Sequence, residues 1–444
     1  MNPLDKKEEY LEQLTDQIRC RKAKDMAAEE ISRHIEDQQE SYRMQGHDES
    51  TAAKKALEEM GDPVEVGKQL DKIHRPRFEW KLFVTALILC LAGVFARYSM
   101  DTSLENMITG PVIVRQLIFI SAGLLLMVGV YFLDYSFLGR YPKLMWFLLI
   151  AVILGYAPFG KWINNQMAYI YVYSMLFIPL FGGIIYAYRN KGYTGILKCL
   201  LFVLLAVAVV TQFIDKSAVY LSLLFSCLIM LLTAVSKNWF ATSKIKAAFM
   251  VIGWLLPAGL IILMSSGGNR LILLLEKLQI LWKPELYARG YQISLIREIL
   301  SGSKLFGSVP EISFQYISGY NNDFILTYII CRWGIVPGIF MIALFALFIA
   351  RMIYISLTRK NSLGMLVGLG CGLVFAVQSV VYILSNLGFR IIDQVIFPFV
   401  SFGGTGIFVN FIVLGLMMSV FRNTSLIKEV PYKDKMFIRI ERVK

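Results

Sequence analysis

The chain has 444 residues, of which 56% are hydrophobic and 17% charged, whereas soluble domains contain about 45–50% apolar and about 25% charged residues. This composition, with a mean hydropathy of +0.57, excludes an ordinary soluble enzyme for lack of polar surface, and it excludes a disordered chain because apolar side chains are too abundant. The net charge of +13 is uneven: residues 1–77 contain 14 Lys and Arg against 18 Asp and Glu, and the remainder contains 31 against 14. The basic residues therefore lie among the apolar runs, which favours contact with anionic lipid headgroups over nucleic acid.

Cysteine and histidine provide no recognisable metal site. The six cysteines include no CxxC pair and no Cys/His cluster, which argues against zinc or a disulfide framework. All three histidines lie within the first 74 residues, so the apolar part has no histidine for catalysis. Because the N-terminus is charged and has helical periodicity, no signal peptide is expected.

Residues 1–75 are predicted to form a small cytoplasmic bundle of helices. Apolar residues recur at helical spacing from Tyr10 onward. Gly61 is suited to end one helix, and Asp62 and Pro63 supply an N-cap and a first-turn proline for the next. The stretch Ala52–Leu70 resembles HAAS-type helical domains, which implies a regulatory or partner-binding role.

From Trp80 onward, apolar runs of about 20 residues follow one another, and each is long enough to cross about 30 Å of hydrocarbon as a helix. The ten predicted spans are residues 80–99, 113–133, 144–160, 167–188, 195–214, 217–236, 246–266, 324–350, 363–385 and 395–421. The predicted fold is therefore an all-α, polytopic membrane protein. Its membrane domain covers residues 80–422, and residues 423–444 form a basic tail.

The distribution of Lys and Arg predicts the orientation of these spans. Alternate short loops contain most of the cations, namely Arg140 and Lys143; Arg189, Lys191 and Lys198; Lys237, Lys244 and Lys246; and Arg351, Arg359 and Lys360. The intervening short loops contain only Lys161, Lys216 and Arg390. We therefore expect a multi-pass protein of the cell membrane with both termini in the cytoplasm.

A long loop interrupts the regular series between spans seven and eight. It covers residues 267–323 on the predicted outer face, and loops of this length are usually functional or disordered. Its apolar content argues against disorder and suffices for one or two interfacial helices.

Asp323 is the best placed of the few carboxylates in the membrane part. It ends the long outer loop and directly precedes an apolar run. At the lip of the bilayer, partial loss of hydration makes a carboxylate a better proton acceptor for a hydroxyl substrate. The alternative is a cap, because an Asp before a helix also satisfies free backbone N–H groups.

The last span contains a proline and three glycines between Pro398 and Gly406. Such a segment bends or opens a helix, and non-helical backbone at membrane depth must be buried or line a polar cavity. One interpretation is a cavity wall that presents backbone donors and the hydroxyls of Ser401 and Thr405. The other is close packing of helices through small residues.

These two segments resemble the SEDS family of RodA, FtsW and SpoVE proteins. The closing signature of that family is matched by Pro398, Phe399, Val400, Ser401, Phe402, Gly403, Gly404 and Thr405. Its outer-loop pattern is matched by Gly290, Tyr291, Gln292, Ser294, Ser301, Gly302 and Gly307, and its Thr-Asp-Phe by Asn322, Asp323 and Phe324. Further matching residues are Arg115, Gln116, Lys161, Trp162, Ile163, Gln378 and Asn386.

The resemblance implies a peptidoglycan glycosyltransferase that polymerises lipid II at the outer face of the membrane, in cell shape, division or sporulation. Asp323 would then be the catalytic base. The residues that the resemblance implies for substrate binding are Gln292, Ser401, Gly403, Gly404 and Arg390. The pyrophosphate of the leaving group requires positive charge, either a divalent cation such as Mg²⁺ or Mn²⁺ or an arginine. The arginines on the outer face are Arg270, Arg289, Arg297 and Arg390. A class B penicillin-binding-protein transpeptidase is the implied partner.

Departures from the family pattern keep two alternatives open. The Gln-Pro-Ser-Glu…Lys motif usual at span four is replaced by the stretch Tyr169–Met175, which lacks both charged members. The chain is then either a divergent enzyme or a non-catalytic scaffold for a transpeptidase. A flippase or transporter of lipid-linked precursors is the third interpretation, but it predicts paired broken helices and buried charge, and the sequence indicates only one strongly interrupted span.

Overall fold

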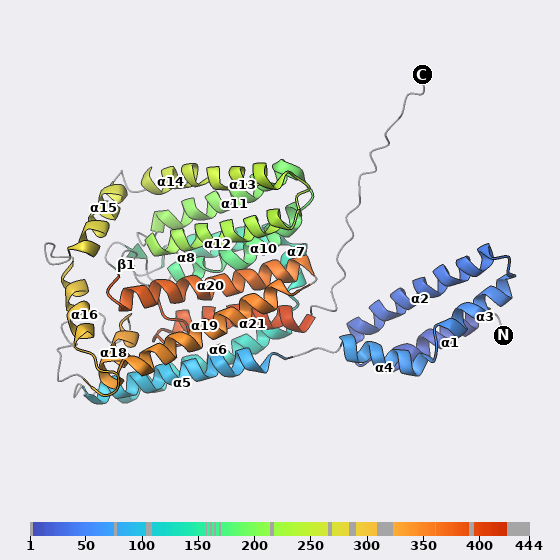
Figure 1. Cartoon of the computed structure of the whole chain (residues 1–444), viewed down its shortest axis with the longest axis horizontal. Coiled ribbons are helices and arrows are strands. Elements are labelled where there is room, and N and C mark those ends of the chain that lie inside the picture. Colours follow the sequence, from blue (N-terminus) through green and yellow to red (C-terminus); the bar gives the residue numbers. More distant parts are fainter. Residues whose placement is uncertain are drawn as a thin grey trace, which may run out of the picture. The chain divides into compact units, whose positions relative to one another are not determined.

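The computed structural model of the protein describes residues 3–74, 78–103, 109–156, 158–159, 162–163, 166–167, 170–213, 217–264, 269–283, 290–308, 323–359, 361–389 and 395–423. The chain divides into two compact units, one within residues 1–78 and one within residues 79–420. Apart from a pair of two-residue antiparallel strands, β1 (Trp162–Ile163) and β2 (Gln166–Met167), every regular element of the described residues is a helix (Figure 1). The predicted all-α class is confirmed.

The N-terminal unit contains four helices: α1 (Pro3–Asp16), α2 (Arg21–Met44), α3 (Glu49–Glu59) and α4 (Pro63–His74). Its hydrophobic core consists of Tyr10, Leu14, Ile18, Ala23, Ala27, Ile35 and Ala56. These positions confirm the helical spacing that the sequence predicts. Gly61 has a φ of 77°, as expected for the residue that separates two helices.

Gly67 lies where α4 meets α1, and its lack of a side chain permits their close approach. A Cβ atom at this position would lie 2.4 Å from the backbone oxygen of Leu14. We expect Gly67→Ala to lower the free energy of unfolding by about 1–2 kcal/mol, because the clash with backbone outweighs the ~0.5–1 kcal/mol by which alanine favours a helix. Urea unfolding of residues 1–78, followed by circular dichroism, measures the change. The exposed Lys68→Ala is the matched control, and equal midpoints for Gly67→Ala and the wild type would contradict the prediction.

Asp48 caps α3, and this cap predicts a pH dependence. Its carboxylate accepts hydrogen bonds from the Ser50 hydroxyl and the Thr51 N–H, and these bonds lower the pKa of Asp48 to about 2. Because an unfolded aspartate has a pKa of about 3.9, the cap stabilises α3 above about pH 4, and this stability is lost as the pH falls towards 2. We expect Asp48→Asn, which still caps, to lose less stability than the wild type between pH 5 and 2. Urea midpoints of residues 1–78 test this, and identical losses would refute it.

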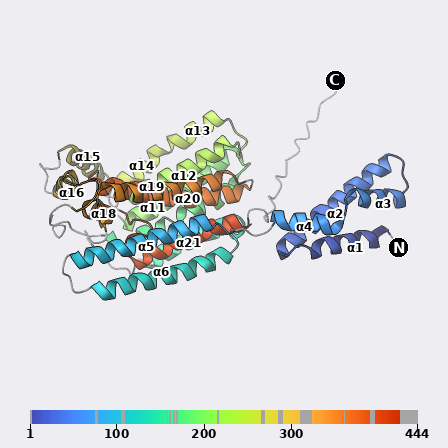
Figure 2. The same ribbon diagram turned by 60° about the horizontal axis from the view of Figure 1, so that its bottom comes forward.

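The membrane unit is a bundle of long helices that run roughly side by side (Figure 1, Figure 2). Its helices are α5 (Trp80–Ser103), α6 (Thr109–Phe132), α7 (Ser136–Arg140), α8 (Pro142–Tyr156), α9 (Ile170–Ser174), α10 (Phe177–Tyr188), α11 (Gly192–Phe213), α12 (Ser217–Ser236), α13 (Lys244–Gly253), α14 (Leu255–Met264), α15 (Asn269–Trp282), α16 (Tyr291–Ser301), α18 (Ile325–Trp333), α19 (Ile335–Leu357), α20 (Ser362–Asn386) and α21 (Gly404–Asn423). In both views α15, α16 and α18 gather at one end of the bundle.

Nine helical segments within the described residues are long and apolar enough to cross a membrane, when α9 is counted with α10 and α13 with α14. They correspond to nine of the ten predicted spans. The described helix of the third predicted span, α8, has only 15 residues. A multi-pass membrane protein is therefore supported, and the count of ten stays a prediction.

Three of the predicted spans are broken where the sequence analysis expects a continuous helix. Helices α10, α14 and α19 each follow a short break and have a proline as their third residue, namely Pro179, Pro257 and Pro337. A proline in this position cannot bond to the residue four before it, and its ring clashes with that carbonyl, so the preceding helix ends. Predicted span eight is consequently two helices, α18 and α19, separated at Gly334 with a φ of 109°.

Helix α20 is the central element of the bundle, and its side chains are buried along almost its entire length. It packs against α10, α12, α18 and α19. Small residues allow α10 to approach it: a Cβ atom on Gly370 would lie 2.8 Å from the Pro179 Cα, and one on Gly182 would lie 3.0 Å from the Val367 nitrogen. This close contact holds α20 as a rigid support for the site at its C-terminal end.

Candidate functional site

Asp323 lies at the end of the bundle where α16 and α18 meet. It is half-buried and directly precedes Phe324, the N-cap residue of α18. The side chain of Phe324 is 1% exposed and packs with Ile296 and Ile299 of α16. Hydrophobic packing on its C-terminal side therefore anchors the candidate base, while its own side chain stays partly accessible.

Asn386, near the end of α20, ties the backbone at Asp323 to the centre of the bundle. Its amide Nδ2 donates to the carbonyl oxygen of Asp323 at 3.0 Å and to that of Tyr382 at 3.0 Å. Its Oδ1 accepts from the backbone N–H of Thr327 at 3.1 Å and from the Thr327 hydroxyl at 3.0 Å. Because Asn386 is fully buried, these bonds form without competition from water and position Asp323.

Tyr382 brings the two segments singled out in the sequence together. Its hydroxyl oxygen accepts from the backbone N–H of Ile325 at 3.0 Å. The same hydroxyl interacts with the side chain of Ser401 and with the charge of Asp323. Its ring stacks on that of Phe397, with centroids 4.3 Å apart. Tyr382 therefore contacts both the start of α18, next to Asp323, and the turn before α21.

These contacts bear on the capping alternative for Asp323. At the start of α18, the N–H groups of Ile325 and Thr327 are satisfied from α20, by Tyr382 and Asn386. The start of α18 is thus supported by residues far away in sequence, and the role of Asp323 as base or cap stays a prediction.

The predicted last span begins later than expected, because residues 395–403 are not helical and α21 starts at Gly404. Within this turn the Ser401 hydroxyl oxygen accepts from the Phe397 N–H at 3.1 Å. Phe399 has a φ of 64°, and Gly403 a φ of 151° that side chains rarely adopt. The turn is buried, so backbone opened at this depth is packed inside protein, as a membrane requires.

The structure gives Ser401, Gly403 and Gly404 distinct local roles. Ser401 is 5% exposed and closes the turn with its hydroxyl. The backbone conformation at position 403 favours a glycine, and the space where a Cβ atom would lie is open. A Cβ on Gly404 would lie 3.0 Å from the ring of Phe119. Close packing thus accounts for Gly404, and Gly403 is the member of this set that has free space beside it.

The other predicted substrate-binding residues are only partly described. Gln292 is half-buried on α16, the helix that packs against α18. Arg390 and Arg289 lie outside the described residues, as does the side chain of Arg270. Arg297 is half-buried, and its guanidinium donates to the carbonyl oxygens of Gly388 at 3.1 Å and Leu281 at 2.9 Å. It joins α15, α16 and the segment after α20 at the same end of the bundle as Asp323.

Two further polar residues, one of them beside the turn, are not among the predicted site residues. Arg97 of α5 is 9% exposed, and its guanidinium lies 5.9 Å from the ring centre of Phe402. Gln116 of α6 is fully buried, and neither atom of its amide has a partner within the described residues. Buried amides without partners are rare and mark groups available to a polar ligand. An arginine inside an apolar run is the sequence signal that could have identified Arg97.

The described residues contain no group of three or more His, Cys, Asp and Glu side chains that could hold a metal ion. The divalent cation implied by the family resemblance therefore has no recognisable ligand set in this part of the chain. Its participation stays a prediction.

Comparison with known proteins gives a consistent result. The family model FtsW/RodA/SpoVE, described as "cell cycle protein", matches residues 79–426. A protein of Enterococcus hirae named "Probable peptidoglycan glycosyltransferase FtsW" is 27% identical over 229 residues, which cover 48% of this chain and 56% of that protein. A protein of the same name from Thioalkalivibrio sp. (strain K90mix) is 26% identical over 146 residues, or 32% of this chain and 36% of that protein. This chain thus matches less than two thirds of the length of either relative.

Solved structures show the same fold. A chain from "Structural coordination of polymerization and crosslinking by a peptidoglycan synthase complex" has a TM-score of 0.60 and 17% identity, covering 78% of this chain and 98% of that chain. The rod shape determining protein RodA of Thermus thermophilus has a TM-score of 0.53 and 15% identity, covering 78% and 97%. Together with the family match over residues 79–426, these likenesses confirm the resemblance, and the chain belongs to the FtsW/RodA/SpoVE family of cell cycle proteins.

Proposed function

We propose that this protein is a peptidoglycan glycosyltransferase that polymerises lipid II into glycan strands at the outer face of the cytoplasmic membrane. The observation that carries the proposal is the support of Asp323, whose backbone is held by Asn386 at a half-buried position. The names of the curated relatives point to the same activity.

In the proposed reaction Asp323 is the general base. Its carboxylate removes the proton from the sugar 4-hydroxyl of one substrate molecule as that oxygen attacks the anomeric carbon of the other. The new glycosidic bond forms while the bond to undecaprenyl pyrophosphate breaks, so the leaving group takes the bonding electron pair and Asp323 takes the proton. A fixed backbone at Asp323 lowers the entropic cost of bringing base and hydroxyl together.

The leaving pyrophosphate requires positive charge at the same end of the bundle. Arg297 is the described arginine among the predicted candidates, and its guanidinium donates to two backbone carbonyls, which do not neutralise its charge. It would therefore contribute a positive potential near the site. Gln292 and Gly403 are proposed to contact the substrate, and Ser401 to hold the turn that presents Gly403.

Location and partners follow from the same proposal. We infer that both termini are cytoplasmic, that residues 1–75 form a separate regulatory domain and residues 423–444 a basic tail, and that a class B penicillin-binding-protein transpeptidase crosslinks the product. A solved structure with the same fold comes from a peptidoglycan synthase complex, which supports a partner of this kind.

The experiment is glycan polymerisation from lipid II by the purified full-length protein, with and without its candidate transpeptidase. Polymer made by the protein under either condition supports the proposal. If no polymer forms with any transpeptidase that co-purifies with the protein, the proposal is wrong and a scaffold role is favoured.

One observation favours the scaffold as the second candidate function. In the stretch that replaces the charged motif of span four, the described helix α9 buries Ile170, Val172 and Ser174. The Ser174 hydroxyl donates to the carbonyl oxygen of Tyr171 at 2.7 Å. An apolar segment, whose serine hydroxyl bonds to the backbone of its own helix, thus occupies the position where the family pattern has a glutamate and a lysine. This replacement changes the inner surface available to a substrate.

A further inference from the structure

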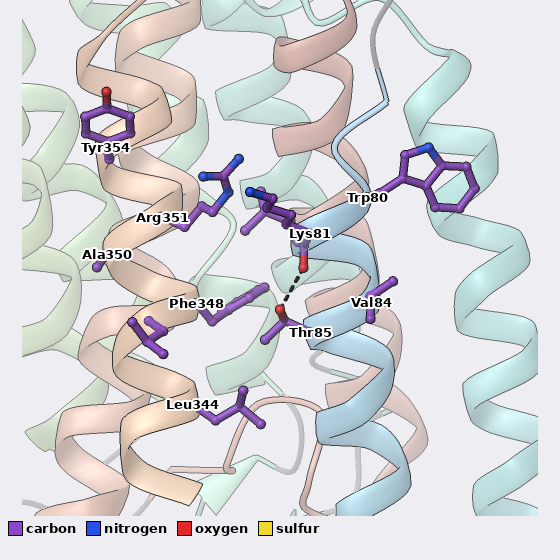
Figure 3. Close-up of a pocket in the computed structure, with 11 residues that line it drawn as sticks. Trp80, Lys81, Val84, Thr85, Leu344, Phe348, Ala350, Arg351 and Tyr354 are labelled. Carbon is purple, nitrogen blue, oxygen red and sulfur yellow. Dashed lines mark hydrogen bonds between the residues drawn. The ribbon is translucent and has the colours of Figure 1, made fainter. Parts of the chain in front are cut away.

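A groove lies between α5 and α19, at the opposite end of the bundle from α15, α16 and α18 (Figure 1, Figure 3). Its volume is about 720 Å³, within the ~300–1,000 Å³ range of small-molecule sites. Leu344 is the first residue of α19 that lines the groove. More than two helical turns of α19 separate it from α18 and Asp323. The groove is therefore separate from the site at Asp323.

The walls of the groove are apolar and follow one face of each helix. On α19 they are formed by Leu344, Leu347 and Phe348, which recur at the three- and four-residue spacing of a helix face. Thr85 points toward them from α5, and Val84 lines the groove from the same helix. From Leu344 to Tyr354 the groove follows about 15 Å of helix, which is about half the ~30 Å hydrocarbon core and thus the depth of one leaflet.

The end of the groove nearest the start of α5 is cationic. Lys81 and Arg351 lie there, with the aromatic side chains of Trp80 and Tyr354 (Figure 3). Trp80 and Tyr354 are 65% and 66% exposed, as is typical of aromatic residues at a membrane interface. By the predicted orientation, this end faces the cytoplasmic leaflet.

Glu79 holds Arg351 in place without using all of its donors. The Glu79 Oε1 accepts from Arg351 Nε at 2.7 Å and from Nη2. Glu79 is 8% exposed, whereas the Arg351 side chain is 37% exposed. A guanidinium has five N–H donors, so its outer N–H groups remain able to bind an anion, and Lys81 has no carboxylate partner among the described residues. Two cations against one carboxylate leave this end of the groove with one net positive charge.

We propose that the groove binds an anionic phospholipid of the cytoplasmic leaflet, with its phosphate between Lys81 and Arg351 and an acyl chain along the apolar walls. The single net positive charge matches the single negative charge of such a lipid. A zwitterionic phospholipid would place its own cation beside Lys81. A transmembrane helix from a partner has no phosphate group, so it would leave Lys81 and Arg351 without an anion unless it also carried a carboxylate at the interface.

The test is native mass spectrometry of the full-length protein in detergent, titrated separately with phosphatidylglycerol and with phosphatidylcholine of the same acyl chains. We expect tighter binding of phosphatidylglycerol. Lys81→Gln should weaken it about fivefold, the factor expected for one basic residue at an anionic surface, and should leave phosphatidylcholine unchanged. Lys246→Gln is the matched control, because Lys246 is also exposed in the first turn of a membrane helix and does not line the groove.

A second variant tests the groove itself. Thr85→Phe fills the space between the helices and should displace the bound lipid, whereas Ile88→Phe, one turn further along α5 and exposed outside the groove, should not. If Thr85→Phe lowers the melting temperature, Ala350→Phe on the opposite wall takes its place, since Ala350 is exposed there.

Three results would overturn the proposal. The first is equal affinity of the wild type for the two lipids, and the second is equal loss in Lys81→Gln and Lys246→Gln. The third is undiminished phosphatidylglycerol binding in the groove-filling variants. If those variants instead lose a co-purifying penicillin-binding protein while lipid binding persists, the groove is a docking site for a helix.

Discussion

Asp323→Asn is expected to reduce the rate of glycan polymerisation from lipid II by about 10²–10⁴-fold, the contribution of a general base. The amide has nearly the same shape as the carboxylate, and the backbone carbonyl that accepts from Asn386 is unchanged. Folding should therefore be retained while proton transfer is lost. The measurement is the initial rate of polymer formation by purified protein with its transpeptidase, beside the melting temperature of each variant.

Glu298→Gln is the matched control for this substitution. Glu298 is an exposed carboxylate on α16, the helix that packs against α18, and it takes no part in the hydrogen bonds of Asn386 that support Asp323. We expect its activity to stay within twofold of the wild type. If Asp323→Asn polymerises lipid II as fast as Glu298→Gln, the assignment of Asp323 as the base is wrong, even though the protein is a polymerase.

Asn386→Leu is expected to destabilise the membrane unit by about 2–4 kcal/mol. The substitution removes four hydrogen bonds and leaves the buried N–H of Thr327 without its partner. Such an unsatisfied group costs about 1–3 kcal/mol, and the other lost bonds add to this cost. Because the carbonyl of Asp323 also loses its donor, activity should fall more steeply than the population of folded protein. Thermal unfolding in detergent and the polymerisation rate at a temperature where the variant is folded measure the two effects.

Asn410→Leu provides the comparison for Asn386→Leu. Asn410 is also a buried asparagine of the bundle, but its Oδ1 has no hydrogen-bond partner within the described residues. Replacing a polar atom without a partner by an apolar group of similar shape costs little, so we expect a change below about 1 kcal/mol. Equal destabilisation by the two substitutions would show that volume, and not the hydrogen bonds of Asn386, sets the cost.

Much of the membrane architecture could be read from the sequence, because insertion into a bilayer depends on local hydrophobicity summed over about 20 residues. The breaks before α10, α14 and α19 were missed, although their signal is also local. Pro179, Pro257 and Pro337 stand inside predicted spans that are apolar over most of their length. Attention to proline, which removes a donor and clashes one turn back, would have located all three.

Local features of the sequence are enough to predict a helical chain that crosses a membrane repeatedly and contains Asp323 and Ser401 in segments that resemble a known family. The three-dimensional fold was needed to show that Asn386 supports Asp323 from 63 positions away, and that Glu79 and Arg351, 272 positions apart, meet beside a groove. The length of each apolar run determines whether that helix can cross the bilayer, independently of the other helices. Contacts between helices depend instead on the rotation and depth of both partners, which are set by packing across the whole bundle.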